Sequence, residues 1–158
     1  LGFPPVIAAD ARLLILGSFP GEASLAAGHY YAHPRNLFWP ILGELLGEPL
    51  IELPFEQRYE FVRVRRIAIW DVLSACRRAG SLDSSIRDAR PNDFAILRGL
   101  APRIERVLFN GQLAGRHAPR FAERGYDTVV LPSTSPAFAA MPAAAKLEGW
   151  RQALAPFL

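Results

Sequence analysis

The sequence predicts an α/β fold in which helices cover both faces of a four-stranded parallel sheet. Four short apolar runs end in turn or polar residues, as is typical of buried parallel strands. Segments with helical periodicity lie between these runs, and strands that alternate with helices pair in parallel. Because 158 residues with 51% hydrophobic side chains can bury one full core, we expect one three-layer domain that spans residues 1–158.

The predicted elements alternate along the chain. Leucine, isoleucine and valine concentrate in four predicted strands, at residues 13–16, 67–70, 106–109 and 128–131. Proline, asparagine or glycine marks ends of the predicted helices, which span residues 36–46, 54–63, 92–101, 112–124 and 142–154. Asn92 is expected to cap the third of these helices, and Gly125 to end the fourth. Segments 80–91 and 132–142 show no periodicity, and we expect them to be loops.

The charge of the chain is unevenly distributed. Its formal net charge of +3 permits a nucleic acid partner without requiring one. Residues 44–60 carry five glutamates and one arginine, whereas residues 63–106 carry ten arginines and five acids. We expect one face to repel phosphate and another to attract it, because the arginine guanidinium group binds phosphate well. The alternative is a compositional bias toward arginine with solvated side chains.

Cysteine content and hydropathy indicate the compartment. Cys76 is the single cysteine, so no disulfide can form within the chain, and we expect a buried free thiol. We recognise no apolar stretch of membrane-spanning length and no signal-like segment, and we expect a cytoplasmic protein without membrane contact. With one cysteine and three histidines the sequence offers no metal-ligand cluster, and we expect neither a metal nor a cofactor.

Chemically distinctive residues come directly after each predicted strand. A glycine and proline turn at 17–21 follows the first strand, and Asp71 ends the second. Asn110 follows the third strand, and a proline and serine segment at 132–135 follows the fourth. Since the carboxyl ends of parallel strands lie at one edge of a sheet, where ligands bind in open α/β folds, we expect a single pocket at this edge.

The turn after the first strand has the composition of a binding loop. Gly17 and Gly21 permit a close approach to a ligand, and Pro20 stiffens the turn. The remaining backbone N–H groups can face an anionic or carbonyl oxygen, which suits a reaction in which negative charge develops. The following segment, 28–39, is crowded with aromatic residues and histidines, and such density is typical of a site rather than a core.

Three segments carry a resemblance to a known family. They read Gly-Ser-Phe-Pro-Gly at 17–21, Tyr-Tyr-Ala-His-Pro-Arg-Asn-Leu-Phe-Trp at 30–39 and Leu-Pro-Ser-Thr-Ser-Pro at 131–136. In order and spacing they resemble the uracil-DNA glycosylase superfamily, most closely its deoxyinosine (hypoxanthine) branch. The similarity runs from about residue 12 to residue 150 and includes shorter matches at 69–73, 80–83, 92–94 and 109–111.

The resemblance implies a monofunctional DNA glycosylase. Such an enzyme flips a deaminated base, hypoxanthine or uracil, out of double-stranded DNA and hydrolyses its N-glycosidic bond, which leaves an abasic site. It would serve base excision repair as a monomer, in the cytoplasm at the nucleoid. The only lysine, Lys146, lies in none of the motifs, which argues against a Schiff-base lyase step. The alternatives are a uracil or G·T/G·U mismatch-specific glycosylase and a catalytically silent nucleic-acid-binding module on the same fold.

The resemblance places the catalytic asparagine at Asn36. A neutral amide oxygen orients water but is a weak base, so the mechanism would be dissociative and most of the barrier would be lowered electrostatically. Considered alone, Asn36 is more typical of a cap for the helix that follows it. Mismatch-specific uracil glycosylases carry an asparagine at the place of Phe19, so this departure favours the deoxyinosine branch. The alternative for Phe19 is plain core packing.

Five further residues are candidates for binding the base. Gly17, Ser18 and Phe19 would line the base pocket, where Ser18 and Phe19 would point backbone N–H groups toward the base oxygen. Tyr31 would stack on the flipped base, with Tyr30 as the second candidate. Asp71 would accept a hydrogen bond from an N–H of the base, or alternatively cap a helix that begins near Val72.

The remaining candidates concern the base edge and the DNA backbone. Asn110 would present a donor and an acceptor to the base, or be a turn residue. Ser133, Thr134 and Ser135 would bind phosphate oxygens around the flipped nucleotide. Phe138 or Met141 would fill the vacated stack as a wedge, or form an apolar lid. His33 would bond a loop carbonyl or approach the sugar.

Overall fold

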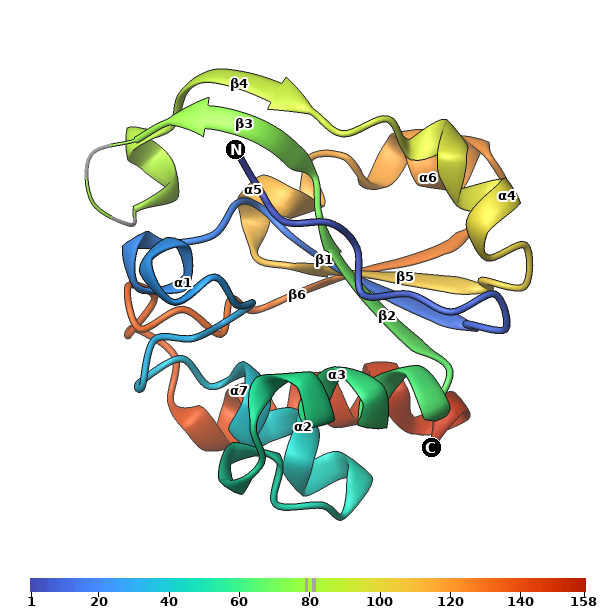
Figure 1. Ribbon diagram of the computed structural model, residues 1–158, viewed down its shortest axis with the longest axis horizontal. Helices are drawn as coiled ribbons and strands as arrows, with labels where there is room; N and C mark the ends of the chain where they lie inside the picture. The colour runs from blue at the N-terminus through green and yellow to red at the C-terminus, as the bar shows by residue number, and fades with distance from the viewer. Residues whose placement is uncertain (79, 81) are drawn as a thin grey trace.

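A four-stranded parallel sheet forms the centre of the protein, as shown by a computed structural model that describes residues 1–78, 80 and 82–158 (Figure 1). Its strands are β1 (Leu13–Gly17), β2 (Ile67–Asp71), β5 (Arg106–Asn110) and β6 (Asp127–Leu131), in the spatial order β2-β1-β5-β6. In the register of the sheet Gly17 lies beside Asp71, and Asn110 lies beside Leu131. The predicted strands and their common carboxyl edge are confirmed.

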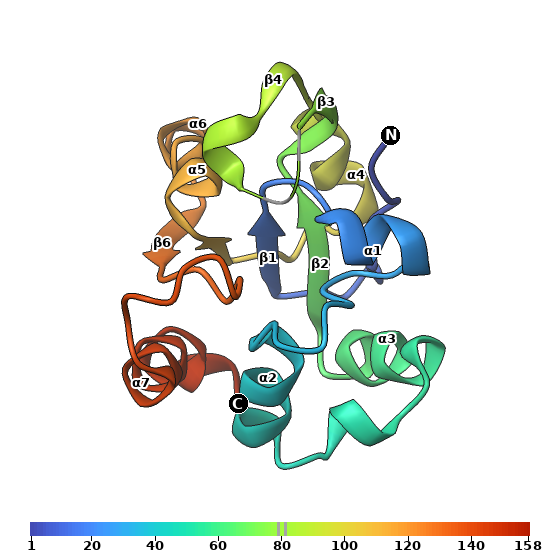
Figure 2. The same cartoon turned by 90° about the vertical axis from the view of Figure 1, so that its left-hand side faces the viewer.

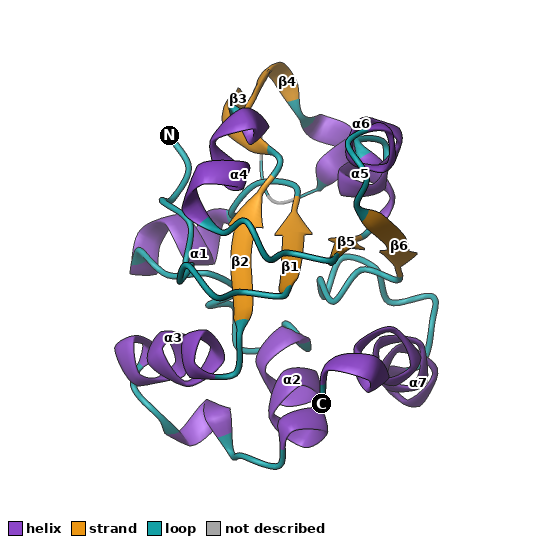
Figure 3. Cartoon of the chain, turned by 90° about the vertical axis from the view of Figure 1, so that its right-hand side faces the viewer, coloured by secondary structure: helices purple, strands orange, loops and turns teal. Residues whose placement is uncertain are grey.

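Helices cover both faces of the sheet (Figure 3). One face carries α2 (Phe38–Leu46), α3 (Phe55–Val64) and α7 (Ala143–Leu154), and the other carries α4 (Leu97–Leu100), α5 (Gln112–Gly115) and α6 (Ala118–Glu123). Because successive strand residues point to opposite faces, Leu13 and Ile15 enter the core under the first group, whereas Leu14 and Leu16 enter the core under the second. The predicted three-layer α/β fold is therefore confirmed.

Two predicted helices are shorter than expected. The helix predicted at 112–124 is divided into α5 and α6, and Pro119 lies in the first turn of α6, where its missing N–H is tolerated. In segment 92–101 a 3₁₀ turn (Phe94–Ile96) precedes α4, and Asp93 caps it by accepting the N–H of Ala95. The predicted cap at Asn92 is wrong, because the Asn92 side chain donates to the backbone carbonyl of Asp71 at 2.8 Å.

The expectation of a loop at 80–91 is wrong in its second half. That half contains β4 (Arg87–Pro91), which pairs antiparallel with β3 (Leu73–Arg77) as a separate two-stranded sheet. Every residue of β4 is exposed, so the strand leaves no apolar alternation in the sequence. The thiol of Cys76 on β3 is free but only half-buried, so the expected burial is wrong as well.

The remaining elements are short. α1 (Glu22–Ala27) follows the turn after β1, and 3₁₀ helices occur at Leu50–Glu52, Asp83–Ser85 and Ala155–Phe157. Figure 2 looks at the carboxyl edge of the sheet, where α1, the 3₁₀ turn Asp83–Ser85 and the loop after β6 surround the end of β1. In the described part of the chain, no helix combines the length and the apolar character that a membrane span requires.

Candidate active site

A cleft of about 1220 Å³ opens at the carboxyl edge of the sheet. This exceeds the roughly 300–1,000 Å³ of most small-molecule pockets, so the cleft has room for an extended ligand. Residues from the ends of β1, β2, β5 and β6 line it together with segment 30–36. All the site residues expected from the sequence are among those that line it, namely Gly17, Ser18, Phe19, Tyr31, Asn36, Asp71, Asn110, Ser133, Thr134, Ser135 and Phe138.

Gly17 lines this cleft and packs closely against Asp71 and Tyr31. A Cβ on Gly17 would lie 2.6 Å from Asp71 Oδ1 and 2.6 Å from the Tyr31 hydroxyl, which leaves no room for a side chain. Beyond it the chain turns, and no acceptor in the described residues takes the backbone N–H of Ser18 or of Phe19. These two N–H groups are therefore available to an oxygen in the cleft.

Tyr31 is held in an unusual backbone conformation by its packing. Its φ is +54°, and its ring stacks on that of Phe38 with centroids 3.9 Å apart and planes 13° from parallel. Its hydroxyl is buried without a hydrogen-bond partner in the described structure. Burial, reinforced by the Asp71 carboxylate, raises the pKa of Tyr31, so the phenol stays protonated and can donate. Tyr30, by contrast, is a core residue whose hydroxyl donates to the carbonyl of Pro4.

Asp71 brings a buried carboxylate into the cleft. It is 4% exposed, and its Oδ2 atom has no hydrogen-bond partner in the described structure. Burial raises the pKa of Asp71 to about 7, although the nearby Arg78 guanidinium acts to lower it. The alternative role as a helix cap is wrong, because strand β3 follows Asp71 and the N–H of Val72 donates to the carbonyl of Gly17. An unpaired buried acceptor of this kind is suited to an N–H of a ligand.

Asn36 combines a place in the cleft with a local structural contact. Its Oδ1 atom accepts the N–H of Phe38, the first residue of α2, at 2.9 Å. This is an Asx-turn contact, from a side chain to the backbone N–H two residues on, and it fixes the orientation of the carboxamide. The alternative role of Asn36 as the helix cap is wrong, because Leu37 is the N-cap of α2 and has no side-chain cap. The oxygen retains a second lone pair, and the Nδ2 atom has no acceptor in the described structure. This local contact and a role toward a ligand are thus compatible.

The side chains of Asn110 and Thr134 are joined by hydrogen bonds. Asn110 Nδ2 donates to Thr134 Oγ1, and Asn110 Oδ1 accepts the backbone N–H of Thr134, both at 2.9 Å. Asn110 is 7% exposed and Thr134 only 1%. The Thr134 hydroxyl is therefore placed against Asn110 rather than toward solvent, where a phosphate would lie. The geometry favours a structural role for both side chains over the binding roles expected from the sequence.

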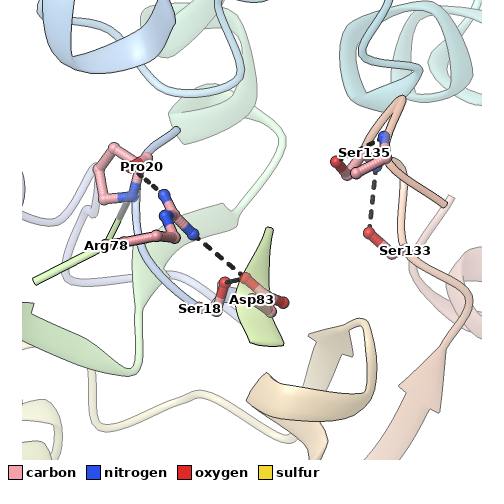
Figure 4. Close-up of polar contacts among 7 residues, drawn as sticks. Ser18, Pro20, Arg78, Asp83, Ser133 and Ser135 are labelled. Atoms are coloured by element: carbon pink, nitrogen blue, oxygen red, sulfur yellow. Dashed lines mark hydrogen bonds and ion pairs between the residues drawn. The ribbon is translucent and has the colours of Figure 1, made fainter. Parts of the chain in front are cut away.

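Ser133 and Ser135 are more accessible than Thr134. Ser133 Oγ accepts the N–H of Ser135, and Ser135 Oγ accepts the N–H of Ala137, each at 3.1 Å (Figure 4 draws the first contact). These contacts shape the loop and leave both hydroxyl protons free to donate. At the end of the loop Phe138 is 38% exposed, and its carbonyl accepts a hydrogen bond from the buried Lys146 ammonium at 2.6 Å.

A network on the opposite wall of the cleft was missed by sequence reasoning. Ser18 Oγ donates to Asp83 Oδ1 at 2.8 Å, and Arg78 pairs with Asp83 at 3.3 Å while it donates to the Pro20 carbonyl at 2.6 Å (Figure 4). These contacts connect the 3₁₀ turn before β4 with the turn after β1. Arg87 and Arg116 also line the cleft. Nothing in the sequence separates these arginines from the others, because only the fold brings them to this edge.

The histidines do not form a metal centre within the described residues, where no three His, Cys, Asp or Glu side chains are grouped suitably. His33 lines the cleft, and its Nδ1 atom accepts the N–H of Arg35 at 3.0 Å, which leaves Nε2 as the free ring nitrogen. His29 stacks on Phe55 with centroids 4.5 Å apart, and His117 packs edge-on against Phe94.

Comparisons with known proteins agree with this geometry. The family model of the Uracil DNA glycosylase superfamily matches residues 4–155. Two proteins named hypoxanthine DNA glycosylase, from Methanosarcina barkeri and Methanosarcina acetivorans, are 42% and 40% identical over 134 residues, which is 85% of this chain and 85% of each relative. An NMR structure of a candidate uracil DNA glycosylase from M. acetivorans matches with a TM-score of 0.90 and 36% identity, over 99% of this chain and 96% of that one.

Proposed function

Because this chain belongs to the uracil DNA glycosylase superfamily and is a DNA glycosylase, we propose that it hydrolytically removes hypoxanthine or uracil from double-stranded DNA and leaves an abasic site. The observation that carries the proposal is the convergence of Asn36, Tyr31 and Asp71 with two free backbone N–H groups in one cleft. A base must leave the DNA stack before an enzyme can act on its glycosidic bond. The cleft volume of about 1220 Å³ accommodates a flipped nucleotide together with flanking backbone.

Recognition of the base rests on groups that lack partners in the folded protein. Hypoxanthine and uracil both present a carbonyl beside an N–H. We assign the N–H to the unpaired Asp71 carboxylate, and the carbonyl oxygen to the N–H groups of Ser18 and Phe19. Tyr31, supported from one side by Phe38, offers its other ring face to the base, and such stacking contributes on the order of 1–3 kcal/mol per base.

Bond cleavage would follow a dissociative course. As the N-glycosidic bond breaks, negative charge develops on the base and positive charge on the sugar, and fixed N–H dipoles near the base oxygen stabilise the departing base. Asn36 then orients the water that captures the sugar cation. Its fixed carboxamide supports this role, because the hydrogen bond from the N–H of Phe38 restricts the side chain while one lone pair stays free.

A covalent lyase step is not part of this proposal. A Schiff base needs an amine that reaches the sugar, and Lys146 is the only lysine of the chain. Lys146 is 3% exposed, and its ammonium is bound to the carbonyl of Phe138. Burial lowers the pKa of Lys146, but the amine lines no part of the cleft. The enzyme would therefore stop at the abasic site.

The DNA backbone would be held from two sides of the cleft. Ser133 and Ser135 retain free hydroxyl protons on one side, and Arg87 and Arg116 contribute positive charge from other segments that line the cleft. Phe138 is exposed at the end of the loop and would fill the space that the flipped base leaves. We propose that the enzyme works as a monomer, in the cytoplasm at the nucleoid.

Oligonucleotide duplexes that carry hypoxanthine, uracil or a G·T mismatch test this function directly. The expected result is release of free hypoxanthine or uracil, with strand breakage only after alkali treatment. Activity confined to uracil or to G·T mismatches would identify the mismatch-specific alternative. Binding of all duplexes without base release would identify a silent binding module, and strand breakage without alkali would contradict the monofunctional assignment.

A further inference from the structure

Thr134 connects the end of β5 with the segment that carries Asn36. On one side Thr134 makes two hydrogen bonds with Asn110, both at 2.9 Å. The Thr134 hydroxyl accepts from Asn110 Nδ2, and the Thr134 backbone N–H donates to Asn110 Oδ1. On the other side its carbonyl oxygen accepts the N–H of Leu37 at 3.0 Å. Leu37 directly follows Asn36 in the chain. A continuous path of three hydrogen bonds therefore runs from Asn110 through Thr134 to the backbone beside Asn36.

The path is built as a rigid unit rather than as a binding surface. Asn110 and Thr134 are 7% and 1% exposed, so water competes little for these hydrogen bonds. Trp150 on α7 holds the same loop by donating to the Pro132 carbonyl at 3.1 Å. Gly111, at a φ of +101°, lets the two segments pack closely, because a Cβ there would lie 3.2 Å from the Cβ of Ser133.

We propose that Asn110 and Thr134 are positioning residues, which hold Asn36 at its working distance from the reacting sugar. The inference rests on the proposed function, in which Asn36 orients the attacking water. It assigns to Asn110 a task other than reading the base, and to Thr134 a task other than binding phosphate. Positioning matters because a displacement of about 1 Å in a catalytic group can slow a reaction by roughly 100-fold.

Loss of the Thr134 hydroxyl would weaken this path at one defined point. Thr134→Val keeps the shape of the side chain but removes the acceptor of Asn110 Nδ2, which then lies buried without a partner. The Asn110 side chain and the loop that carries Thr134 would shift so that the Asn110 Nδ2 group finds another acceptor. The carbonyl of Thr134 would move with the loop, and the N–H of Leu37 would lose its acceptor.

The test compares Thr134→Val, Thr134→Ser and the wild type in single-turnover base release at saturating enzyme. We expect Thr134→Val to slow release by roughly 10- to 100-fold, with little change in affinity for abasic-site DNA, and Thr134→Ser to restore most of the rate. Thr128→Val is the matched control, because Thr128 lies on β6 outside the cleft. Thr134→Ala, which also lacks the hydroxyl, replaces the valine variant where that variant does not fold.

Amide hydrogen exchange at Leu37 supplies a readout that does not depend on activity. We expect faster exchange at Leu37 in Thr134→Val and unchanged exchange at Leu108 in the middle of β5. A wild-type rate in Thr134→Val, a Thr134→Ser variant as slow as Thr134→Val, or unchanged Leu37 exchange would each overturn the inference. Failure of the proposed function is distinguishable, because the wild type would then release no base, or Asn36→Ala would release it at the wild-type rate.

Discussion

The carboxylate of Asp71 lies against the backbone of Gly17, so that a Cβ on Gly17 would be only 2.6 Å from Asp71 Oδ1. The two residues are neighbours in the parallel register of β1 and β2. The missing side chain at position 17 thus makes room for a buried carboxylate at the point where the two strands end. This packing leads to the first prediction.

Gly17→Ala should disturb the packing of Asp71 and Tyr31 at the end of β1. The new methyl group must displace both Asp71 and Tyr31, and such overpacking costs about 1–3 kcal/mol of stability. We expect at least a tenfold lower single-turnover rate of base release. Gly99→Ala is the matched control, because a Cβ there meets no atom within 4 Å, and it should leave the rate unchanged. An active Gly17→Ala variant would show that Asp71 and Tyr31 need not hold their positions.

The buried carboxyl of Asp71 should make stability depend on pH. Burial raises its pKa from 3.8 to about 7 in the folded state. The folded protein therefore retains a proton that the unfolded chain releases, so the contribution to stability is complete below about pH 4 and is lost as pH rises through about 7. The full loss corresponds to roughly 4 kcal/mol, a net value in which the attraction of Arg78 already offsets part of the cost of burial.

Urea unfolding of the wild type and of Asp71→Asn between pH 4 and pH 8 measures this effect. The difference between the two proteins isolates Asp71 from the other carboxyl groups. We expect the wild type to lose stability relative to Asp71→Asn as pH rises, while base release by the wild type increases because the ionised carboxylate accepts the base N–H. Parallel stability curves for the two proteins would contradict the raised pKa.

Asn36→Ala should separate catalysis from binding. We expect base release to fall by several orders of magnitude with nearly intact DNA affinity, because the water loses its acceptor. Loss of the hydrogen bond to the N–H of Phe38 should also lower stability by about 0.5–1.5 kcal/mol. Asn36→Asp keeps an acceptor for that N–H and controls for this hydrogen bond. Near wild-type single-turnover release by Asn36→Ala would remove Asn36 from the mechanism.

The two kinds of phosphate contact should differ in salt dependence. Replacement of Ser133 and Ser135 by alanine removes neutral donors, so affinity should fall with hardly any change in the slope of log affinity against log salt concentration. Arg116→Ala, at the cleft, should flatten that slope by about 1. Arg103→Ala serves as control, since Arg103 is exposed before β5 at the opposite edge of the sheet. Unchanged affinity of the Ser133 and Ser135 double-alanine variant for abasic-site DNA would show that this loop does not bind the DNA phosphates.

Base preference should follow from Phe19, an apolar residue that lines the cleft about 5.9 Å from the Arg78 guanidinium. Without a polar side chain at this place the pocket stabilises the leaving base less, which favours the more labile purine bond. We expect hypoxanthine to be released faster than uracil from matched duplexes, and Phe19→Asn to shift activity toward uracil. Faster release of uracil by the wild type at saturating enzyme would contradict this assignment.

The amino-acid sequence by itself determined the layered fold and the place of the site. The apolar runs at 13–16, 67–70 and 106–109 are almost fully buried, as is typical of parallel strands with helices on each face, whereas the run at 128–131 lies in the partly exposed edge strand β6. Because parallel strands end at one edge, the positions of Asp71 and Asn110 in the chain already predicted a common cleft. These features depend on local periodicity, which a sequence displays directly.

The tertiary structure alone decided what each polar group does in the cleft. Asn110 faces Thr134 across a separation of 24 residues, and Arg78 reaches Pro20 across 58. The hydrogen bonds of β4 are likewise invisible in its exposed, charged sequence. Whether an amide binds a ligand or a neighbouring loop depends on which partner lies within about 3 Å in the folded chain. That partner is set by packing of distant segments, and no periodicity in the sequence records it.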